Sequence, residues 1–219
     1  MRVLVVNPNS TESMTDGIVS AARAAAAEDM IVQGLTNKNG PAAIQGPEDG
    51  EASVPGTLAL IKAAADQGYD AAIIACFDDT GLYEARAAVP IPVIGIGQAA
   101  FHAGMIFGRF SVITTLPVSV PVIEQNIARY GMTGACAKVR ASGLPVLSLE
   151  NDPVGAEICL TDCAATAVEQ DRVDALVMGC AGMSAFGAAM TKASGLPAID
   201  GVAAAVGLAR TVVTAAGKT

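Results

Sequence analysis

Two stretches of this chain, about a hundred residues apart, share one pattern: Tyr69-Asp70-Ala71-Ala72-Ile73-Ile74-Ala75-Cys76 and Val173-Asp174-Ala175-Leu176-Val177-Met178-Gly179-Cys180. Each reads as Asp-Ala, a short apolar run, a small residue and then cysteine. An unbroken apolar run of this length is typical of a parallel strand buried on both faces. The pattern predicts two strands in equivalent places, each ending in a thiol, within a duplicated unit folded about a pseudo-twofold axis.

Other landmarks repeat in the same order in both halves. Arg2 and Arg109 each open an earlier strand that ends in polar residues and a proline. After each cysteine come a turn, a helix and a proline-led strand, Pro92-Val93-Ile94 in one half and Pro197-Ala198-Ile199 in the other. Because βα units resemble one another in general, the order of the landmarks favours duplication more than any one of them does.

The composition predicts a well-packed α/β protein. Of the 219 residues, 52% are hydrophobic and only 16% are charged, which excludes a disordered chain. Short runs rich in Val and Ile alternate with Ala-rich helical stretches, so we predict parallel sheets covered by helices. We expect two pseudo-symmetric Rossmann-like domains with the active site in the cleft between them, the first formed by 1–100 with 201–219 and the second by 101–200.

The predicted elements follow from this alternation. The predicted strands are Val3–Val6, Ile31–Leu35, Ala71–Ala75, Val93–Ile96, Phe110–Thr115, Ala137–Ala141, Ala175–Gly179 and Leu196–Ile199. The predicted helices lie near 12–27, 54–67, 81–88, 98–107, 118–130, 154–170, 184–194 and 201–216. The longest irregular stretch, 37–50, is rich in Gly and Pro and is a candidate mobile cover over the site.

Charge and cysteine usage narrow the partners and the compartment. The formal net charge is -8 and no Lys or Arg run is present, which disfavours nucleic acid and anionic membranes. No apolar stretch approaches the ~20 residues of a membrane span, and the apolar run at the N-terminus is too short for a signal peptide. Five cysteines in a chain without an export signal indicate reduced thiols. We therefore expect a cytoplasmic protein that acts on a small molecule, with no nucleic-acid or membrane partner.

Cys76 and Cys180 are the candidate catalytic residues. Ligands of parallel α/β sheets bind at the carboxyl ends of the strands, where both thiols are expected. A thiol at a helix N-terminus is expected to have a pKa lowered toward neutrality, and the same N–H groups could stabilise negative charge on a substrate carbonyl. Two opposed acid/base groups suit proton removal from one face of a carbon and delivery to the other. The competing interpretation is that each cysteine is a small buried hydrophobe, as we expect for Cys136, Cys159 and Cys163.

Further candidates lie at the ends of the strands and in the 37–50 loop. Polar side chains there suit amide and carboxylate groups, although turn and cap chemistry explains many of them equally well. Phe77 and Met183 could supply an apolar wall or belong to the core. The candidate substrate-binding residues are Asn7, Ser10, Ile44, Phe77, Asp79, Thr80, Thr114, Thr115, Ala181, Gly182 and Met183.

Two other site types are disfavoured by the sequence. Gly95-Ile96-Gly97-Gln98-Ala99-Ala100 matches a dinucleotide-binding fingerprint, but the acidic residue expected about 20 positions later is missing. Tight turn chemistry explains the glycines better. A zinc site is not supported either, because there is no Cys-x-x-Cys and the single histidine, His102, lies in an apolar helical stretch.

The chain resembles the hydantoin/allantoin racemases of the aspartate/glutamate racemase superfamily. The resemblance runs from about residue 2 to 208. The chain departs from the family pattern at Ala43 and Gln45, where Ser and Glu are more typical. This departure bears on the choice of substrate more than on the chemistry. It is carried by Asn7-Pro8-Asn9-Ser10, Ala75-Cys76-Phe77-Asp78-Asp79-Thr80-Gly81-Leu82, Phe110-Ser111-Val112-Ile113-Thr114-Thr115, Gly179-Cys180-Ala181-Gly182-Met183 and Pro197-Ala198-Ile199-Asp200-Gly201-Val202.

The resemblance implies a cofactor-independent mechanism with no metal, in which one cysteine removes the proton at C5 of a hydantoin ring and the other returns one to the opposite face. It also implies a homo-oligomer. The sequence agrees in that both positions are Cys, whereas a decarboxylase of this superfamily can manage with one. Alternatives that stay open are aspartate/glutamate racemase, maleate isomerase and a non-catalytic small-molecule binding module; a nucleotide-binding module is a weaker one.

Overall fold

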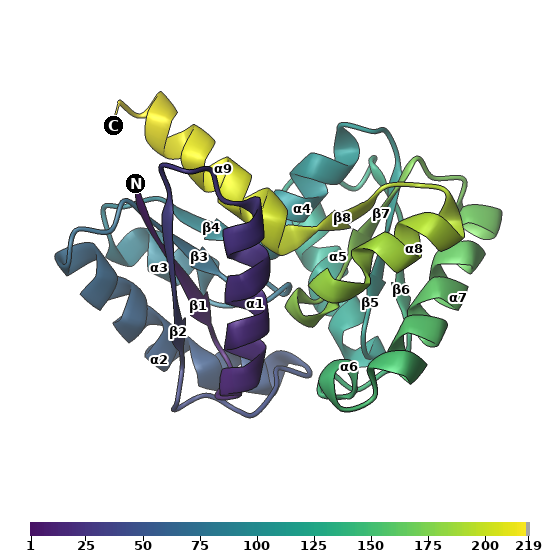
Figure 1. Ribbon diagram of the computed structural model, residues 1–219, viewed down its shortest axis with the longest axis horizontal. Coiled ribbons are helices and arrows are strands. Elements are labelled where there is room, and N and C mark those ends of the chain that lie inside the picture. The colour runs from purple at the N-terminus through teal and green to yellow at the C-terminus, as the bar shows by residue number, and fades with distance from the viewer. Residues whose placement is uncertain (218–219) are drawn as a thin grey trace.

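Two four-stranded parallel sheets, each flanked by helices, form the protein (Figure 1). The computed structural model describes residues 1–217. The strands are β1 (Arg2–Asn7), β2 (Ile31–Thr36), β3 (Ala71–Ile74), β4 (Val93–Gly95), β5 (Phe110–Thr114), β6 (Cys136–Ala141), β7 (Ala175–Met178) and β8 (Ala198–Asp200). The helices are α1 (Glu12–Ala25), α2 (Pro47–Asp66), α3 (Leu82–Ala88), α4 (Ile96–Met105), α5 (Val120–Arg129), α6 (Ser148–Asn151), α7 (Pro153–Asp171), α8 (Gly187–Ser194) and α9 (Gly201–Ala215), with 3₁₀ helices η1 (Pro117–Ser119) and η2 (Ala181–Phe186).

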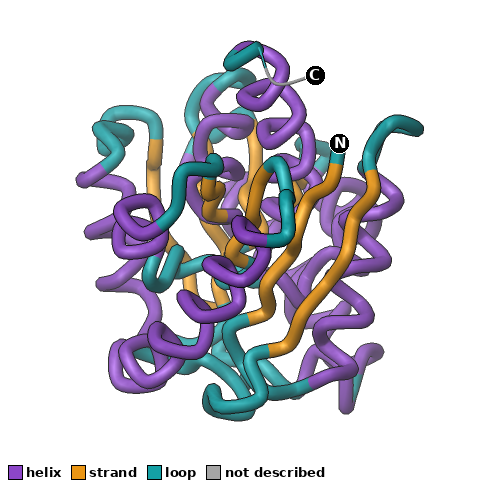
Figure 2. The backbone as a smooth tube through the Cα atoms, turned by 90° about the vertical axis from the view of Figure 1, so that its left-hand side faces the viewer, coloured by secondary structure: helices purple, strands orange, loops and turns teal. Residues whose placement is uncertain are grey.

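The two sheets have the same strand order. The first runs β2-β1-β3-β4 and the second β6-β5-β7-β8, so each strand of the first sheet has a counterpart four strands later in the chain. The cysteine-bearing strands β3 and β7 occupy matching positions, paired in parallel with β1 and β5. Figure 2 shows strands in layers with helices packed around them, as a buried parallel sheet requires. The predicted fold class, two pseudo-symmetric α/β units with parallel sheets, is confirmed.

A continuous apolar core joins the two halves. Phe77 follows β3 of the first sheet, Phe101 lies on α4, and Phe110 begins β5 of the second sheet. The Phe101 ring packs edge-to-face on Phe77 at 5.3 Å between centroids and stacks on Phe110 at 5.9 Å. All three side chains are buried in one cluster that also takes in residues of β1, β7 and α9.

The last helix returns to the first half. It begins directly after β8, and it packs against α1 and α4 (Figure 1). This path is in keeping with the assignment of 201–219 to the first domain; residues 218 and 219 lie outside the described part. The division at residues 100 and 200 stays a prediction.

Most predicted elements lie within a few residues of the observed ones, and α2 differs most. We predicted a helix from residue 54, but it begins at Pro47. Gly46 adopts a positive φ of 125°, Pro47 takes the first helical position, and two acidic residues follow in the first turn. These are helix-start signals, and Pro55 inside the helix does not end it. The irregular stretch is therefore shorter than predicted. Of the helices in residues 1–217, none is long and apolar enough to span a bilayer.

Candidate active site

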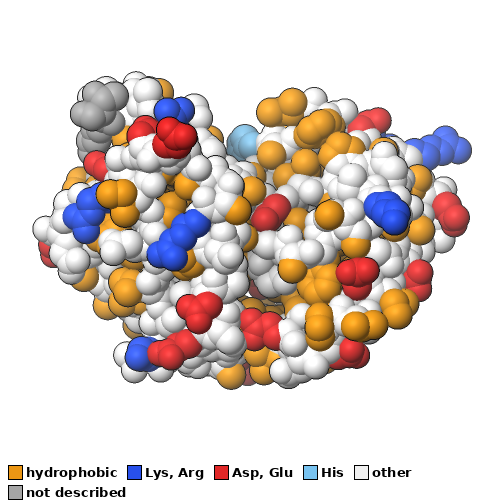
Figure 3. Space-filling model, viewed as in Figure 1, with side chains coloured by type: hydrophobic (Ala, Val, Ile, Leu, Met, Phe, Trp, Pro, Cys, Tyr) orange, Lys and Arg blue, Asp and Glu red, His pale blue; other side chains and the backbone are white. Residues whose placement is uncertain are grey.

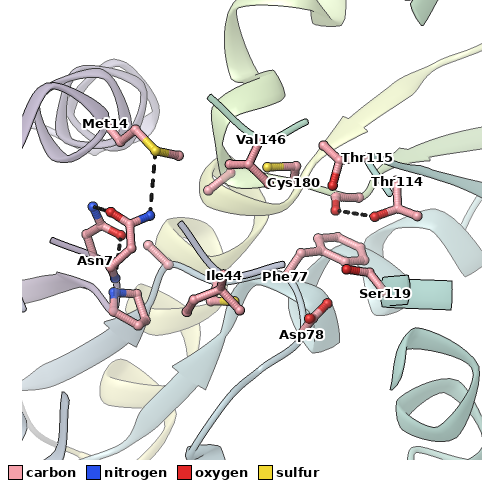
Figure 4. Close-up of a pocket in the computed structure, with 16 residues that line it drawn as sticks. Asn7, Met14, Ile44, Phe77, Asp78, Thr114, Thr115, Ser119, Val146 and Cys180 are labelled. Carbon is pink, nitrogen blue, oxygen red and sulfur yellow. Dashed lines mark hydrogen bonds between the residues drawn. The ribbon is translucent and has the colours of Figure 1, made fainter. Parts of the chain in front are cut away.

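Cys76 and Cys180 line one cavity at the carboxyl ends of β3 and β7. The empty space at this site amounts to about 420 Å³ when the adjoining open solvent is included, and it lies between the two halves. Figure 4 shows Cys180 and Val146 facing Ile44, Phe77 and Asp78 across it. The lining residues are Asn7, Pro8, Asn9, Met14, Ile44, Ala75, Cys76, Phe77, Asp78, Thr114, Thr115, Ser119, Val146, Gly179, Cys180 and Ala181.

Each thiol has a main-chain N–H partner, and the two partners occupy equivalent positions in the two halves. The N–H of Asp78 interacts with the Cys76 thiol, and the N–H of Gly182 with the Cys180 thiol; both contacts favour the thiolate. In each case the donor lies two residues after the cysteine. The Thr80 hydroxyl also lies 3.8 Å from the Cys76 sulfur. The predicted equivalence of the two cysteines therefore extends to their immediate surroundings.

Burial raises the pKa of both thiols, so the expected lowering toward neutrality is wrong for this cavity. Desolvation raises the pKa of Cys180 to about 11, and the Asp78 charge adds to the rise. The pKa of Cys76 is raised further, by desolvation first and then by the charges of Asp78 and Cys180. Helix α3 begins only at Leu82, and Cys180 precedes a 3₁₀ helix. One N–H group at each sulfur does not offset the loss of water.

Among the lining residues, only Asp78 has a carboxyl group. Burial raises the pKa of this carboxyl to about 7, with a further rise from the neighbouring Asp79 charge. None of the lining residues is a Lys, Arg or His. The cavity is therefore polar but without a cation in its wall.

Asp79, a predicted substrate-binding residue, faces away from the cavity. Its buried carboxyl accepts the N–H groups of Gly97 and Gln98, at 2.9 and 2.7 Å, and the Tyr130 hydroxyl at 2.8 Å. Burial raises its pKa to about 6, and the Tyr130 hydrogen bond opposes that rise. Asp79 thus caps α4.

The glycines of the fingerprint-like segment make room for this carboxyl. A Cβ at Gly95 would collide with the Asp79 carboxyl, and one at Gly97 with the main-chain oxygen of Phe77. The N–H groups at the start of α4, where such a fingerprint would hold a phosphate, are already bonded to Asp79. The close approach of a protein carboxylate accounts for these glycines.

Eight of the other predicted residues meet at the cavity. The structure places Asn7, Ile44, Cys76, Phe77, Thr114, Thr115, Cys180 and Ala181 in its wall. Two of their side chains are already engaged. Asn7 donates through Nδ2 to Asn9 Oδ1 at 2.8 Å, and Thr114 donates to the Gly179 carbonyl at 3.1 Å.

Four further predicted residues lie outside the wall, as Asp79 does. Ser10 pairs through its N–H with the Pro41 carbonyl, and Met183 is fully buried in the core of the second half. Thr80 lines a neighbouring groove and contacts Cys76 from behind. Gly182 contributes only its N–H, to Cys180.

Half of the wall was not among the predicted site residues: Pro8, Asn9, Met14, Ala75, Asp78, Ser119, Val146 and Gly179. Met14 lies on the buried face of α1 and Val146 in the loop after β6; with Ala43 they form a small apolar cluster across the two halves. The Val146 N–H donates to Gln45 Oε1 at 3.1 Å. Because these residues are distant in the chain, no local pattern indicates that they meet.

A groove beside the cavity lies between α1 and α7. It shares Met14 and Ala181 with the cavity wall, and the Ser13 hydroxyl donates to Glu150 Oε2 at 2.8 Å. The molecule is hollowed between its two halves on the face drawn in Figure 3. The thiol cavity therefore borders the larger hollow between the halves.

The remaining cysteines and the histidine lie elsewhere. We had expected Cys136, Cys159 and Cys163 to be small buried hydrophobes, but each is only half-buried. His102 is exposed, and its Nδ1 lies 2.7 Å from the Gln98 carbonyl oxygen. Within residues 1–217, no group of three His, Cys, Asp or Glu side chains is arranged to hold a metal ion.

Comparisons with known proteins agree over the whole chain. The sequence pattern described as Asp/Glu/Hydantoin racemase matches residues 3–209. A hydantoin racemase of Rhizobium meliloti is 47% identical over 216 residues, 98% of this chain and 90% of that protein. One of Pseudomonas sp. (strain NS671) is 39% identical over 220 residues, 100% of this chain and 88% of that protein. The solved structure of an allantoin racemase from Klebsiella pneumoniae has a TM-score of 0.95 at 35% identity, covering 99% of this chain and 89% of that one.

Proposed function

Because the chain belongs to the Asp/Glu/Hydantoin racemase family, we propose that this isomerase racemises 5-substituted hydantoins or allantoin by proton transfer between Cys76 and Cys180. Relatives named as hydantoin racemases and an allantoin racemase support the substrate class. The observation that carries the mechanism is the presence of both thiols in the wall of one cavity, each with its N–H partner.

The reaction needs one thiolate and one thiol at a time. The thiolate removes the C5 proton, and the electron pair moves into the adjacent ring carbonyl, which gives a planar enolate. The opposite thiol then donates its proton to the other face of C5 and becomes the thiolate. For the other enantiomer the two cysteines exchange roles. Every σ bond made or broken in this cycle involves hydrogen, and the ring carbonyl is restored when C5 is reprotonated, so the cycle consumes no co-reactant.

The high thiol pKa values fit a strong base that forms rarely. The Cys180 thiol has a pKa of about 11, so its thiolate is a stronger base than an ordinary cysteine thiolate. Burial also strengthens the interaction between main-chain N–H groups and the negative charge that develops on the substrate. Iodoacetamide alkylates thiolates, so thiols with a high pKa react slowly at neutral pH whether or not they are catalytic. Alkylation therefore does not distinguish an enzyme from a binding module, whereas exchange of the C5 proton does.

The character of the wall favours a neutral ring over a dicarboxylate. Aspartate, glutamate and maleate carry two carboxylates at neutral pH, and the lining residues offer Asp78 and no cation. A cyclic ureide has amide-like donors and acceptors that suit polar neutral groups such as Thr115 and Ser119. The cytoplasmic location and the homo-oligomer stay predictions.

The test incubates enantiopure 5-benzylhydantoin and allantoin separately with the protein in deuterated water. Circular dichroism follows loss of handedness and NMR follows loss of the C5 proton. We expect both signals to decay, and Cys76→Ser and Cys180→Ser each to reduce racemisation by at least about 10²-fold, the scale of one acid/base group. Each single variant should still exchange the C5 proton of one enantiomer.

Cys136→Ser is the matched control, because this half-buried thiol lies outside the cavity wall. It should racemise like the unmodified protein. Full racemase activity in either cavity variant would refute the two-thiol mechanism, and no exchange with either substrate would refute the substrate class.

A further inference from the structure

The two thiols of the cavity are matched, but a charged side chain stands beside only one of them. Two residues after Cys76 stands Asp78, whereas two residues after Cys180 stands Gly182. The main-chain N–H groups of Asp78 and Gly182 act alike, since each favours the thiolate of the cysteine two positions earlier. Only the first half adds a side chain at this place, and that side chain is a carboxylate. The matched thiols do not need it, so it calls for a separate explanation.

The Asp78 backbone is held while its carboxyl group is left available. Asn126 on α5 donates through Nδ2 to the main-chain carbonyl of Asp78 at 2.7 Å. Within the described residues 1–217, its carboxyl oxygens have no hydrogen-bond partner. Figure 4 shows the Asp78 side chain at the cavity with no bond drawn to the other lining residues. Its neighbour Asp79 has three partners.

No cation of the cavity wall neutralises this carboxylate. Asp78 also borders the groove behind the cavity. There, the Arg129 guanidinium lies over the Tyr83 ring, 4.7 Å from its centre. The titratable or charged groups around Asp78 are Cys76, Cys180, Asp79, Glu51, Tyr83, Glu84 and Arg129.

We propose that Asp78 is a specificity-determining residue, an inference that rests on the proposed function. Its carboxylate accepts a hydrogen bond from a ring N–H of the ureide. Its charge excludes the ring-opened form of the substrate, the N-carbamoyl amino acid. The two compounds share the substituent and the stereocentre. They differ by one water molecule, because hydrolysis opens the ring and leaves a carboxylate. A cavity of neutral polar groups would accept both.

Electrostatics makes the distinction strong in this place. A second carboxylate in the cavity would lie near Asp78 in a poorly hydrated space, where repulsion is large and no lining cation compensates it. The neutral ring, by contrast, gives the unpartnered carboxyl a donor. One residue thus favours the ring and disfavours its hydrolysis product.

The test measures binding of 5-benzylhydantoin and of N-carbamoylphenylalanine, its ring-opened form, by calorimetry and as substrate and competitive inhibitor. It uses pH 7.5, where most of the Asp78 carboxyl, with its pKa of about 7, is ionised and the imide-like N–H of the hydantoin ring is still largely protonated. In Asp78→Asn we expect N-carbamoylphenylalanine to bind at least tenfold more tightly. In Asp78→Ala we expect the KM for 5-benzylhydantoin to rise at least tenfold, because the acceptor is gone.

Glu51→Gln is the matched control, since it removes an exposed carboxylate from the groove behind Asp78 and outside the cavity. Both affinities should stay within twofold. The proposal is overturned when Asp78→Asn leaves the affinity for N-carbamoylphenylalanine unchanged, or when Glu51→Gln shifts it equally. Calorimetry needs no turnover, so a protein that binds the ring without racemising it would refute the proposed function and still test Asp78.

Discussion

Asp78 and Asp79 are neighbours in the chain, but their carboxyl groups have different surroundings. Asp78 lines the cavity without a hydrogen-bond partner within residues 1–217, whereas Asp79 is buried and accepts three. Burial raises the pKa of both, to about 7 and about 6. The same chemical group therefore costs stability at one position and organises a helix at the next.

We expect Asp78→Asn to stabilise the protein at pH 8 by about 1 to 2 kcal/mol, discounted for its partial exposure. Its pKa in the folded protein, about 7, lies above the ordinary value of 3.8, so between about pH 4 and 7 the unfolded chain releases this proton while the folded protein keeps it. Stability is then lost as pH rises through that window. Urea unfolding of both proteins at pH 4.5 and pH 8 measures the difference, which should be larger at pH 8.

Asp79→Asn should have the opposite effect, a loss of about 2 to 4 kcal/mol, because an amide cannot accept all three donors and leaves buried N–H groups unpaired. Equal shifts in the two variants would contradict this account of the pair.

The segment between β2 and α2 covers the cavity at the scale of one element. Ile44 lines the cavity, Ala43 packs with Met14 and Val146, and Gln45 accepts the Val146 N–H from the other half. Gln45 is also held through its own N–H by Asp49 Oδ2 at 3.0 Å, in the first turn of α2. The segment is therefore anchored to both halves while it forms part of the cavity wall.

Gln45→Ala should raise the KM for the racemised substrate severalfold, with a smaller change in kcat. The lost hydrogen bond holds the cover to the second half, and its net worth is about 1 kcal/mol. Steady-state kinetics on 5-benzylhydantoin measures the split. Gln45→Glu is the matched control, because a carboxylate of the same reach keeps the acceptor. Identical kinetics in Gln45→Ala and the unmodified protein would show that the contact does not position the cover.

At the scale of the whole molecule, the two halves share one core. Val5 and Ile73 of the first sheet belong to the same buried cluster as Val112 and Val177 of the second. Hydrogen bonds also cross between the halves, among them Tyr130 to Asp79 and Asn126 to Asp78. A cavity formed between such halves keeps a defined width because neither half moves without breaking core contacts.

We expect the halves to unfold together. Ile73→Ala, at a fully buried position in β3, should cost about 2 to 5 kcal/mol. Hydrogen-exchange mass spectrometry along a urea series should show the same loss for peptides of β3 and of β7. A loss confined to the first half would indicate two independent domains. Leu160→Ala is the matched variant, since Leu160 is buried in a cluster of the second half, and it should likewise destabilise both.

The sequence alone determined the elements and their duplicated order. Apolar runs such as Ala71–Ile74 and Ala175–Met178 are local patterns, and a buried parallel strand is set by residues that are adjacent in the chain. The positions of both cysteines at strand ends follow from the same pattern. Helix α2 was predicted to start late because its first residues, Pro47 to Gly50, were assigned to the Gly- and Pro-rich irregular stretch 37–50.

Only the tertiary structure decided what surrounds the thiols. Met14, Ile44 and Val146 meet at the cavity although they come from distant parts of the chain. The direction of the thiol pKa shift was mispredicted for the same reason: burial depends on everything packed around a sulfur, whereas the helix start that we relied on is local. The strands follow from neighbours in sequence, and the chemistry of the cavity from neighbours in space.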